Sequence, residues 1–287
     1  MALFVIVDHI LGKGINLLSI YAKGGDTAKN VHITRFLDED VLILGSSRAS
    51  NHYVPDSLEH HLGLSTYNCG QNENGIILFY PLMNLIKQRH KPKMLIYDVY
   101  TMDLLDGMRF NGIDYLTILK PVYGVECVDS MFHRAEYNSK IKMHSRLYRH
   151  NSTFLNLIID VVKNRDIYHK GFYQLNTGIL QNPSVSLSSK HDFVYDPEKL
   201  SFLEKFIVEN KDSVKLIFAI SPEYGKIDDI MFEPLKMLCN TYNIPLLNHY
   251  CDTTFTYHKE LFSNQNHLNH KGANLYSSII SKELEEQ

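Results

Sequence analysis

The sequence predicts an α/β fold, a flavodoxin-like three-layer α/β/α arrangement around a central parallel sheet of five strands. Five short runs are apolar without alternation, which is typical of strands buried on both faces. Helical patterns separate most of these runs, as the crossovers of a parallel sheet require. From 101 to 213 no such run occurs, and that interval is too long for one crossover. The strands are expected at 41–45, 65–70, 94–100, 215–221 and 244–250.

Residues 1–38 are expected to form an N-terminal helix and its lead-in. Phe4, Val7 and Ile10 recur at helical spacing and predict an amphipathic helix, docked on the core or lying at a membrane surface. Asp8 and nearby polar residues interrupt the apolar run, so it falls short of the roughly 18 uncharged residues of a membrane span. The run also suits the tail of a longer anchor, which gives a peripheral or an anchored association with a membrane.

Helices are expected on both sides of the predicted strands. The pattern at 74–90 ends in a basic turn before a proline, and a helix at 197–211 begins with Asp196 as its N-cap. The third strand is followed by a mostly helical insertion, 101–213. Because ligand sites of α/β proteins lie at the carboxyl ends of the strands, this insertion is expected to be a lid or a substrate-recognition layer. We expect one domain, 1–287. Further helices are expected at 152–164 and 271–285.

Composition excludes several classes of function. The chain has 287 residues and a formal net charge of −3, and no lysine- or arginine-rich face suggests nucleic acid. The cysteines form no C-x-x-C pair, which leaves isolated thiols or two disulfides open. No H-E-x-x-H motif and no Gly-rich phosphate loop is present, so no metal and no cofactor is expected. The cysteines are Cys69, Cys127, Cys239 and Cys251.

The stretch "VLILGSSRASNHYVP", 41–55, ends a predicted buried strand on Gly45, Ser46 and Ser47. A serine here either caps the next helix or acts as a nucleophile on an exposed turn. The G-x-S-x-G elbow of the α/β-hydrolases is absent, and the stretch alone leaves both interpretations open. A second stretch, "NQNHLNHKGA", places His267 in a loop just before the last helix.

Together these stretches resemble the SGNH (GDSL-type) hydrolases, and more closely a bacterial envelope branch whose first block reads G-S-S-R. The resemblance covers the predicted sheet, about 40–100 and 214–285. It implies that Ser47 is the nucleophile and His267 the general base. It also implies that Gly70, in "YNCGQNENG", donates its N–H to the oxyanion. Asn72 and Asn68 lie beside Gly70 as side-chain donors, Asn72 to the oxyanion and Asn68 to substrate.

The chain departs from the family pattern at two positions. The third block normally carries an asparagine that donates to the oxyanion, and here that strand end carries Asp98. The expected donors are then the N–H groups of Ser47 and Gly70 with Asn72, and the alternative is an incomplete oxyanion hole. The fifth block is normally D-x-x-H, and here Asn264 precedes His267 by three residues. An asparagine oxygen accepts the Nδ1–H bond but carries no charge to stabilise an imidazolium; in the serine-protease template this change costs about 10⁴ in rate. Asp252 or a backbone carbonyl is the alternative partner for the histidine.

Two further residues are expected at the substrate. Arg48 either binds an anionic or polyhydroxylated substrate group or pairs with Asp98 as a structural tie. Tyr173, in the polar stretch "YHKGFYQL" at 168–175, either faces a sugar ring or lies in a solvated loop.

The resemblance implies a serine esterase that hydrolyses an O-acyl ester, such as an acetyl ester on carbohydrate, in a protein of the bacterial cell envelope that faces the periplasm. A cytoplasmic location is the alternative. The two departures motivate a competing interpretation, a weak or inactive relative that binds glycan or assists polysaccharide acetylation. An acyltransferase would use the same serine and differ in what the insertion excludes from the site.

Overall fold

The computed structural model describes residues 2–107, 114–136, 138–163, 165–176, 178–185 and 193–287. The chain divides into two compact units, and each is described by itself. The helical unit comprises 1–37, 80–90 and 109–168, and the sheet unit comprises 38–79, 91–108 and 169–287. The predicted insertion, 101–213, is therefore shared between the two units, and its residues 108–113, 137, 164, 177 and 186–192 lie outside the described part.

The sheet unit is built on five parallel strands in the order β2-β1-β3-β4-β5, which confirms the predicted α/β fold. The register aligns Gly45, Asp98 and Ala219 across three neighbouring strands, so their carboxyl ends meet at one edge of the sheet. No strand of this sheet lies in the described part of 101–213, as predicted. The strands are β1 (Val41–Gly45), β2 (Thr66–Asn68), β3 (Met94–Asp98), β4 (Lys215–Ile220) and β5 (Leu246–Asn248).

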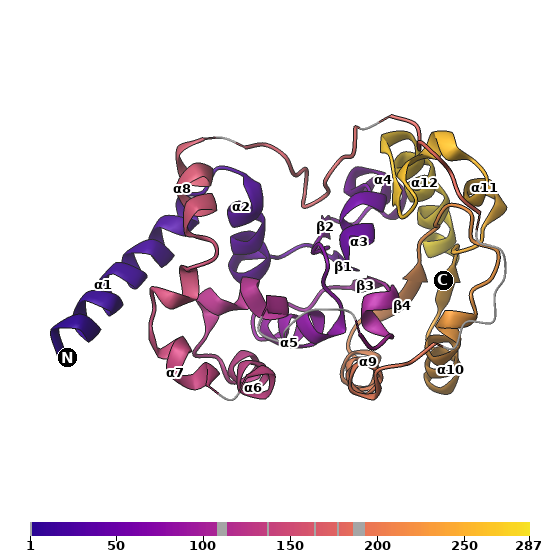
Figure 1. The fold of residues 1–287 in the computed structure, drawn as a ribbon. Helices are drawn as coiled ribbons and strands as arrows, with labels where there is room; N and C mark the ends of the chain where they lie inside the picture. Colours follow the sequence, from indigo (N-terminus) through magenta and orange to yellow (C-terminus); the bar gives the residue numbers. More distant parts are fainter. Residues whose placement is uncertain (1, 108–113, 137, 164, 177, 186–192) are drawn as a thin grey trace. The chain divides into compact units, whose positions relative to one another are not determined.

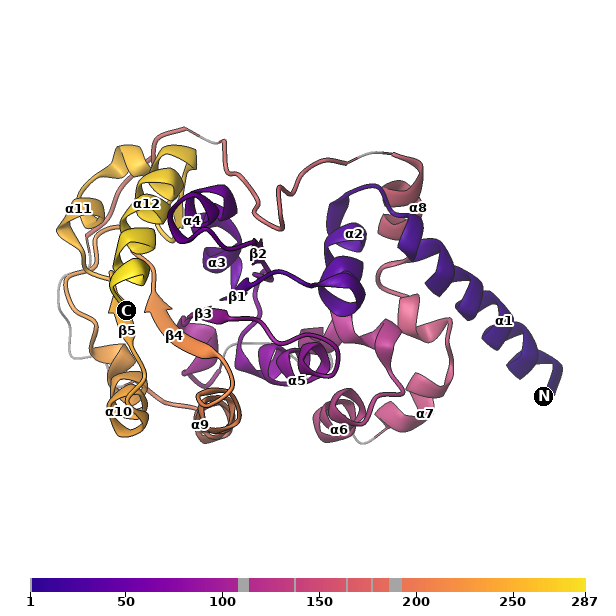
Figure 2. The same ribbon diagram turned by 180° about the vertical axis from the view of Figure 1, so that it is seen from behind.

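Helices cover both faces of the sheet in three layers (Figures 1 and 2). On one face Ile43 and Ile96 share a buried cluster with Tyr276 of α12 (His270–Glu286). On the other face the Tyr97 ring packs at 5.4 Å from that of Phe206 in α9 (Pro197–Asn210). Burial on both sides explains why inner strands such as β1 and β3 are continuous apolar runs in the sequence. The remaining helices of this unit are α3 (Ser47–His52), α4 (Pro55–Leu62), the start of α5 (Ile76–Lys87), η3 (Thr101–Asp103), η6 (Ile230–Phe232), α10 (Glu233–Tyr242), α11 (Thr253–Thr256) and η7 (Lys259–Leu261).

Side-chain caps determine where two of the predicted helices, α9 and α12, begin. The carboxylate of Asp196 accepts the N–H groups of Glu198 and Lys199 at the start of α9, as expected for an N-cap. The amide oxygen of Asn269 accepts the N–H of Gly272 and starts α12. The helices predicted at 74–90, 197–211 and 271–285 are confirmed by α5, α9 and α12.

One local prediction is wrong. His267 was expected in a loop, and it lies in β7 (His267–Leu268), which pairs antiparallel with β6 (Phe262–Asn264) as a short hairpin. The amide oxygen of Asn264 accepts the N–H groups of Asn266 and His267, both at 3.0 Å, and this tightens the hairpin turn. Two- and three-residue strands leave no periodic signal in a sequence.

In the described part of the helical unit, every regular secondary-structure element is a helix. Its α8 confirms the helix predicted at 152–164, and part of α5 belongs to this unit. The stretch Leu3–Tyr21 is long and apolar enough to cross a membrane, at a mean hydropathy of 1.6, contrary to the expectation that it falls short. The other helices are α1 (Ala2–Leu18), η1 (Ser19–Tyr21), α2 (Gly25–Val31), the π-helix η2 (His32–Phe36), η4 (Asp114–Val122), α6 (Glu126–Ala135), α7 (Ser139–His144), η5 (Tyr148–His150) and α8 (Phe154–Val162).

Candidate active site

A serine–histidine pair lies at the carboxyl edge of the sheet. Gly45 ends β1 with φ +138°, and a Cβ there would lie 2.5 Å from the carbonyl oxygen of Asp98, so only glycine fits this turn. Ser46 accepts the N–H of Arg48 at 3.3 Å and caps α3. Ser47 is the first residue of α3, and its Oγ lies 2.7 Å from Nε2 of His267. The two interpretations of the double serine therefore fall on different residues: Ser46 is the cap, and Ser47 faces the histidine.

Asn264 determines which nitrogen of His267 carries the proton. Its Oδ1 accepts the backbone N–H groups of Asn266 and His267 and lies 2.9 Å from His267 Nδ1. Two obligatory donors require that the amide oxygen, not the NH₂ group, faces this position. His267 Nδ1 must then be the protonated nitrogen, which leaves Nε2 free to accept the Ser47 hydroxyl proton. The tautomer that a general base needs is in place without an aspartate.

The surroundings keep His267 neutral. Burial lowers the pKa of His267 to about 4, with a smaller contribution from the positive charge of Arg48. Both effects disfavour the imidazolium that must form when Ser47 loses its proton. The pair is therefore in the correct protonation state across neutral pH, and its imidazolium lacks the negative partner that an aspartate would supply.

Of the expected oxyanion donors, the Ser47 N–H is available, whereas the Gly70 N–H and the Asn72 side chain are not in place. As the first residue of α3, Ser47 has a backbone N–H with no intrahelical acceptor, and in the described part of the chain this N–H donates to no other group. The N–H of Gly70 instead donates to Asn68 Oδ1 at 3.0 Å. A Cβ on residue 70 would lie 2.4 Å from the nitrogen of Ser50, so close packing against α3 explains this glycine. Asn72 lies exposed in the turn after β2, and in the described part its side chain makes no hydrogen bond to the pair.

Asn68 holds structure rather than substrate. It is fully buried, and its Nδ2 donates to the carbonyls of Ala49 and Tyr53 at 2.7 and 2.9 Å. With Oδ1 bonded to the Gly70 N–H, the amide ties β2 to α3. The expectation of a substrate contact at Asn68 is therefore corrected, because no face of this side chain is exposed.

Arg48 is also internal, at 1% exposure. Its Nη1 lies 2.8 Å from Oε2 of Glu223, and the guanidinium donates to Ser221 and lies over the Tyr100 ring. The expectation that Arg48 contacts substrate is wrong, because the side chain is buried and cannot reach a bound molecule. The structural tie is present, but its ion-pair partner is Glu223 rather than Asp98, and burial makes a paired charge necessary.

Of the two remaining candidates, Tyr173 stays a candidate for substrate contact and Asp252 is excluded as the partner of His267. Tyr173 is 37% exposed, and its N–H and carbonyl bond to Ser50 and Asn51, so the segment runs along α3. Its contact with substrate stays a prediction. Asp252 caps α11 through Thr254 N–H and accepts from His249, so it is not the partner of His267.

Sequence reasoning missed His52, a fully buried side chain at the end of α3. Its Nε2 accepts the N–H of Leu268, next to His267, and its Nδ1 lies 3.0 Å from Oγ of Ser221. The only sequence signal is a histidine five positions after Ser47, and such spacing has no specific meaning without the fold.

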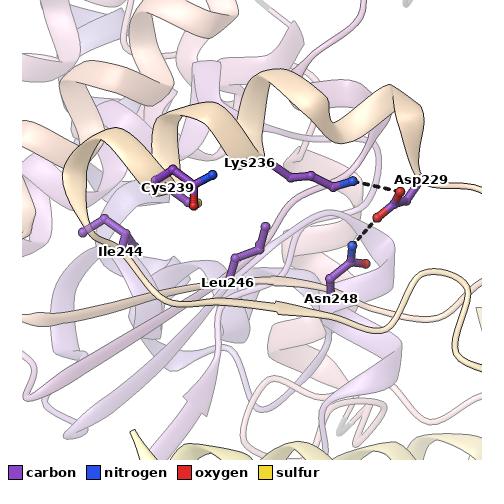
Figure 3. A pocket seen from close by; sticks show the side chains of 7 residues that line it. Asp229, Lys236, Cys239, Ile244, Leu246 and Asn248 are labelled. Atoms are coloured by element: carbon purple, nitrogen blue, oxygen red, sulfur yellow. Dashed lines mark hydrogen bonds and ion pairs between the residues drawn. The ribbon is translucent and has the colours of Figure 1, made fainter.

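A cavity of about 510 Å³ lies between α10 and β5 (Figure 3). Lys236 pairs with Asp229 at 2.8 Å, and Asn248 donates to the same carboxylate. Burial raises the pKa of the Cys239 thiol to about 12, so it is no nucleophile. No residue of the Ser47–His267 pair lines this cavity. Its lining is Asp229, Lys236, Cys239, Asn240, Ile244, Leu246 and Asn248.

No family model matches the sequence, and no curated protein matches it. Solved structures similar to this chain include a protein from Lactobacillus plantarum, with 12% identity, a TM-score of 0.44 and coverage of 88% of this chain and 99% of that chain. A protein from Desulfitobacterium hafniense described as a lipolytic protein of the G-D-S-L family has 13% identity, a TM-score of 0.40 and coverage of 84% and 97%. A protein from Streptococcus pneumonia described as a platelet activating factor has 10% identity, a TM-score of 0.44 and coverage of 99% and 98%. With TM-scores of 0.44 or less these similarities carry no functional conclusion.

Proposed function

We propose that this protein is a serine esterase. The observation that carries the proposal is the 2.7 Å separation of Ser47 Oγ and His267 Nε2, with the ring held in the base tautomer by Asn264. A hydroxyl with a neutral imidazole acceptor at this distance is the arrangement required for general-base activation of a nucleophile.

The proposed reaction has two steps. Ser47 Oγ attacks the ester carbonyl while its proton passes to His267 Nε2, and the imidazolium then returns that proton to the leaving alcohol. A water molecule, deprotonated by the same nitrogen, releases the acid from the acyl-serine. The Ser47 N–H serves as the oxyanion donor, since it has no other hydrogen-bond partner among the residues that the structure describes. With one such donor and no carboxylate behind the histidine, we expect a slow enzyme.

For the substrate we propose an O-acetyl ester on carbohydrate, in a protein of the cell envelope. The support is the resemblance of the G-S-S-R and H-L-N blocks to the envelope branch. A second candidate, a weak or inactive glycan-binding relative, is favoured by the Gly70 N–H, which is bonded to Asn68. Acyl transfer to a sugar hydroxyl would use the same first step.

A fluorophosphonate probe separates these functions. We expect the probe to label Ser47 in the wild type, and p-nitrophenyl acetate to be hydrolysed slowly. Ser47→Ala should abolish both signals. Ser46→Ala is the matched control, because it removes only the helix cap and costs about 1 kcal/mol of stability. Absence of labelling in a folded wild type would favour the binding protein, and labelling lost equally in both variants would contradict the assignment to Ser47.

We also propose that α1 associates with a membrane. Residues 3–7 are each 44% or more exposed, and as five consecutive residues they surround the helix instead of forming one face. The Asp8 carboxylate, which interrupts the apolar run, accepts the N–H groups of Arg146 and Leu147. In the sequence of the helical unit, lysines and arginines outnumber acidic residues, which favours an anionic lipid surface.

Vesicle sedimentation tests this association. We expect the wild type to sediment with phosphatidylcholine–phosphatidylglycerol vesicles, and the double variant Phe4→Glu and Ile6→Glu to stay in the supernatant. Retained esterase labelling in the variant would show that it is folded. Equal sedimentation of both proteins would contradict the proposal.

A further inference from the structure

We propose that His52 is a positioning residue that fixes the distance between the nucleophile and the base; the proposal rests on the esterase function proposed above. His52 ends α3, the helix that Ser47 begins. Its Nε2 accepts the backbone N–H of Leu268 at 3.0 Å, and Leu268 follows His267 in β7. One side chain therefore connects the helix of the nucleophile to the strand of the base.

The ring of His52 has a single tautomer. A backbone N–H is always a donor, so Nε2 must be unprotonated, and Nδ1 carries the hydrogen that Ser221 Oγ accepts at 3.0 Å. Burial, with the positive charge of Arg48, lowers the pKa of His52 well below its usual value. The neutral ring thus bonds at both nitrogens and has no spare donor or acceptor for substrate.

The connection continues into the sheet. Ser221 follows β4, and its Oγ donates to Oδ2 of Asp98 at 3.0 Å while its N–H donates to Oδ1 at 2.8 Å. Asp98 is the last residue of β3 and also accepts the hydroxyl of Tyr53 at 2.8 Å. The path from Leu268 through His52 and Ser221 therefore ends on a fixed carboxylate at the sheet edge. This gives Asp98, which stands where an oxyanion-binding asparagine was expected, the role of an anchor.

Arg48 also bonds to Ser221 and belongs to the same network. Its Nε donates to Ser221 Oγ at 3.1 Å, so this oxygen accepts two hydrogen bonds and donates one. The His52 and His267 rings meet edge to face, with centroids 6.2 Å apart. Because every partner is buried and bonded, a shift of β7 relative to α3 breaks hydrogen bonds in a water-free place, which is costly. A misplacement of about 1 Å lowers catalysis about 10²-fold.

Three variants test the role. His52→Phe keeps the ring volume but removes both hydrogen bonds, and we expect Ser47 labelling to slow about 10–100-fold. His52→Gln offers an amide oxygen to Leu268 and an NH₂ group to Ser221, so we expect it to recover most of the rate. Ser221→Ala removes the bonds of the Ser221 hydroxyl to His52, Arg48 and Asp98 but leaves the bond between His52 and Leu268 in place, and it provides a second variant if His52→Phe does not fold. His258→Gln, an exposed histidine of the same unit, is the control for unchanged labelling.

A second readout does not require catalysis. Nitrogen-15 NMR of the His267 ring should give protonated Nδ1 and titration near pH 4 in the wild type. In His52→Phe we expect the pKa of His267 to move closer to its ordinary value, because β7 is no longer held against α3 and water reaches the ring, while Asn264 keeps Nδ1 protonated. Wild-type labelling that is absent, with these NMR changes present, rejects the esterase but keeps the network. Unchanged labelling and unchanged His267 titration in folded His52→Phe would overturn the positioning role.

Discussion

Replacing Asn264 with aspartate measures what the missing charge costs. The substituted carboxylate would stand where Oδ1 now lies, 2.9 Å from His267 Nδ1. Two unit charges roughly 4 Å apart attract by about 1 kcal/mol in bulk water and about 4 kcal/mol near a protein surface. Residue 264 is exposed, so the lower part of that range applies. A stabilisation of about 1–2 kcal/mol corresponds to about 5–30-fold in rate.

This gain is much smaller than the factor of about 10⁴ lost in the serine-protease template, where the asparagine favours the wrong tautomer. Here the backbone N–H groups of Asn266 and His267 already orient the amide oxygen, so only the charge is missing. The assay is p-nitrophenyl acetate hydrolysis by Asn264→Asp and wild type, with Asn264→Asp in a Ser47→Ala background as the blank. We also expect the midpoint of the acid limb of the pH profile to move to higher pH, because the carboxylate stabilises the imidazolium and so raises the pKa of His267. A gain near 10⁴ would refute the tautomer assignment, and a gain below about twofold would refute the electrostatic one.

Three more outcomes follow from the site. The labelling rate should stay constant from pH 8 to about 5 and halve near pH 4, because only neutral His267 accepts the proton and its pKa is about 4; a midpoint near 6.5 would contradict the burial of the ring. Gly70→Ala should lower the free energy of unfolding by about 1–3 kcal/mol in urea denaturation, since its Cβ would lie 2.4 Å from Ser50 N, and an unchanged midpoint would contradict this close packing. Arg48→Met should lower the free energy of unfolding by about 1.5–3 kcal/mol, because it removes a charged hydrogen-bond partner of the buried Glu223 carboxylate, which keeps its ion pair with Lys226, and Arg48→Met with Glu223→Gln should recover part of that loss.

The sheet was predictable because burial on both faces leaves a direct signal in the sequence. Strands such as β1 and β3 are buried at every position and read as unbroken apolar runs. The short hairpin that carries His267 was not predictable, because two residues in β7 define no period. The division into two units also left no signal, since it joins 1–37 with segments far away in the sequence.

The candidate pair was predictable from motif order, but its surroundings were not. Ser47 and His267 are 220 positions apart and meet at 2.7 Å only because β1 and β7 reach the same edge. The sequence predicts Asn68 as a donor to substrate, yet its side-chain amide is already hydrogen-bonded to backbone groups of Ala49 in α3 and of Gly70 after β2. Arg48 and Glu223 form a buried pair across 175 positions, and pairing of that kind depends on tertiary contacts that no local pattern encodes.

Mass spectrometry of the protein after reaction with a fluorophosphonate tests the central claim most directly. We expect one covalent adduct, located on the peptide that contains Ser47, formed in wild type and Ser46→Ala and absent from Ser47→Ala. His267→Ala should slow its formation by at least about 10²-fold, as the loss of a general base requires. A folded wild type that forms no adduct, or an adduct on another serine, would contradict the assignment of Ser47 and His267 as a catalytic pair.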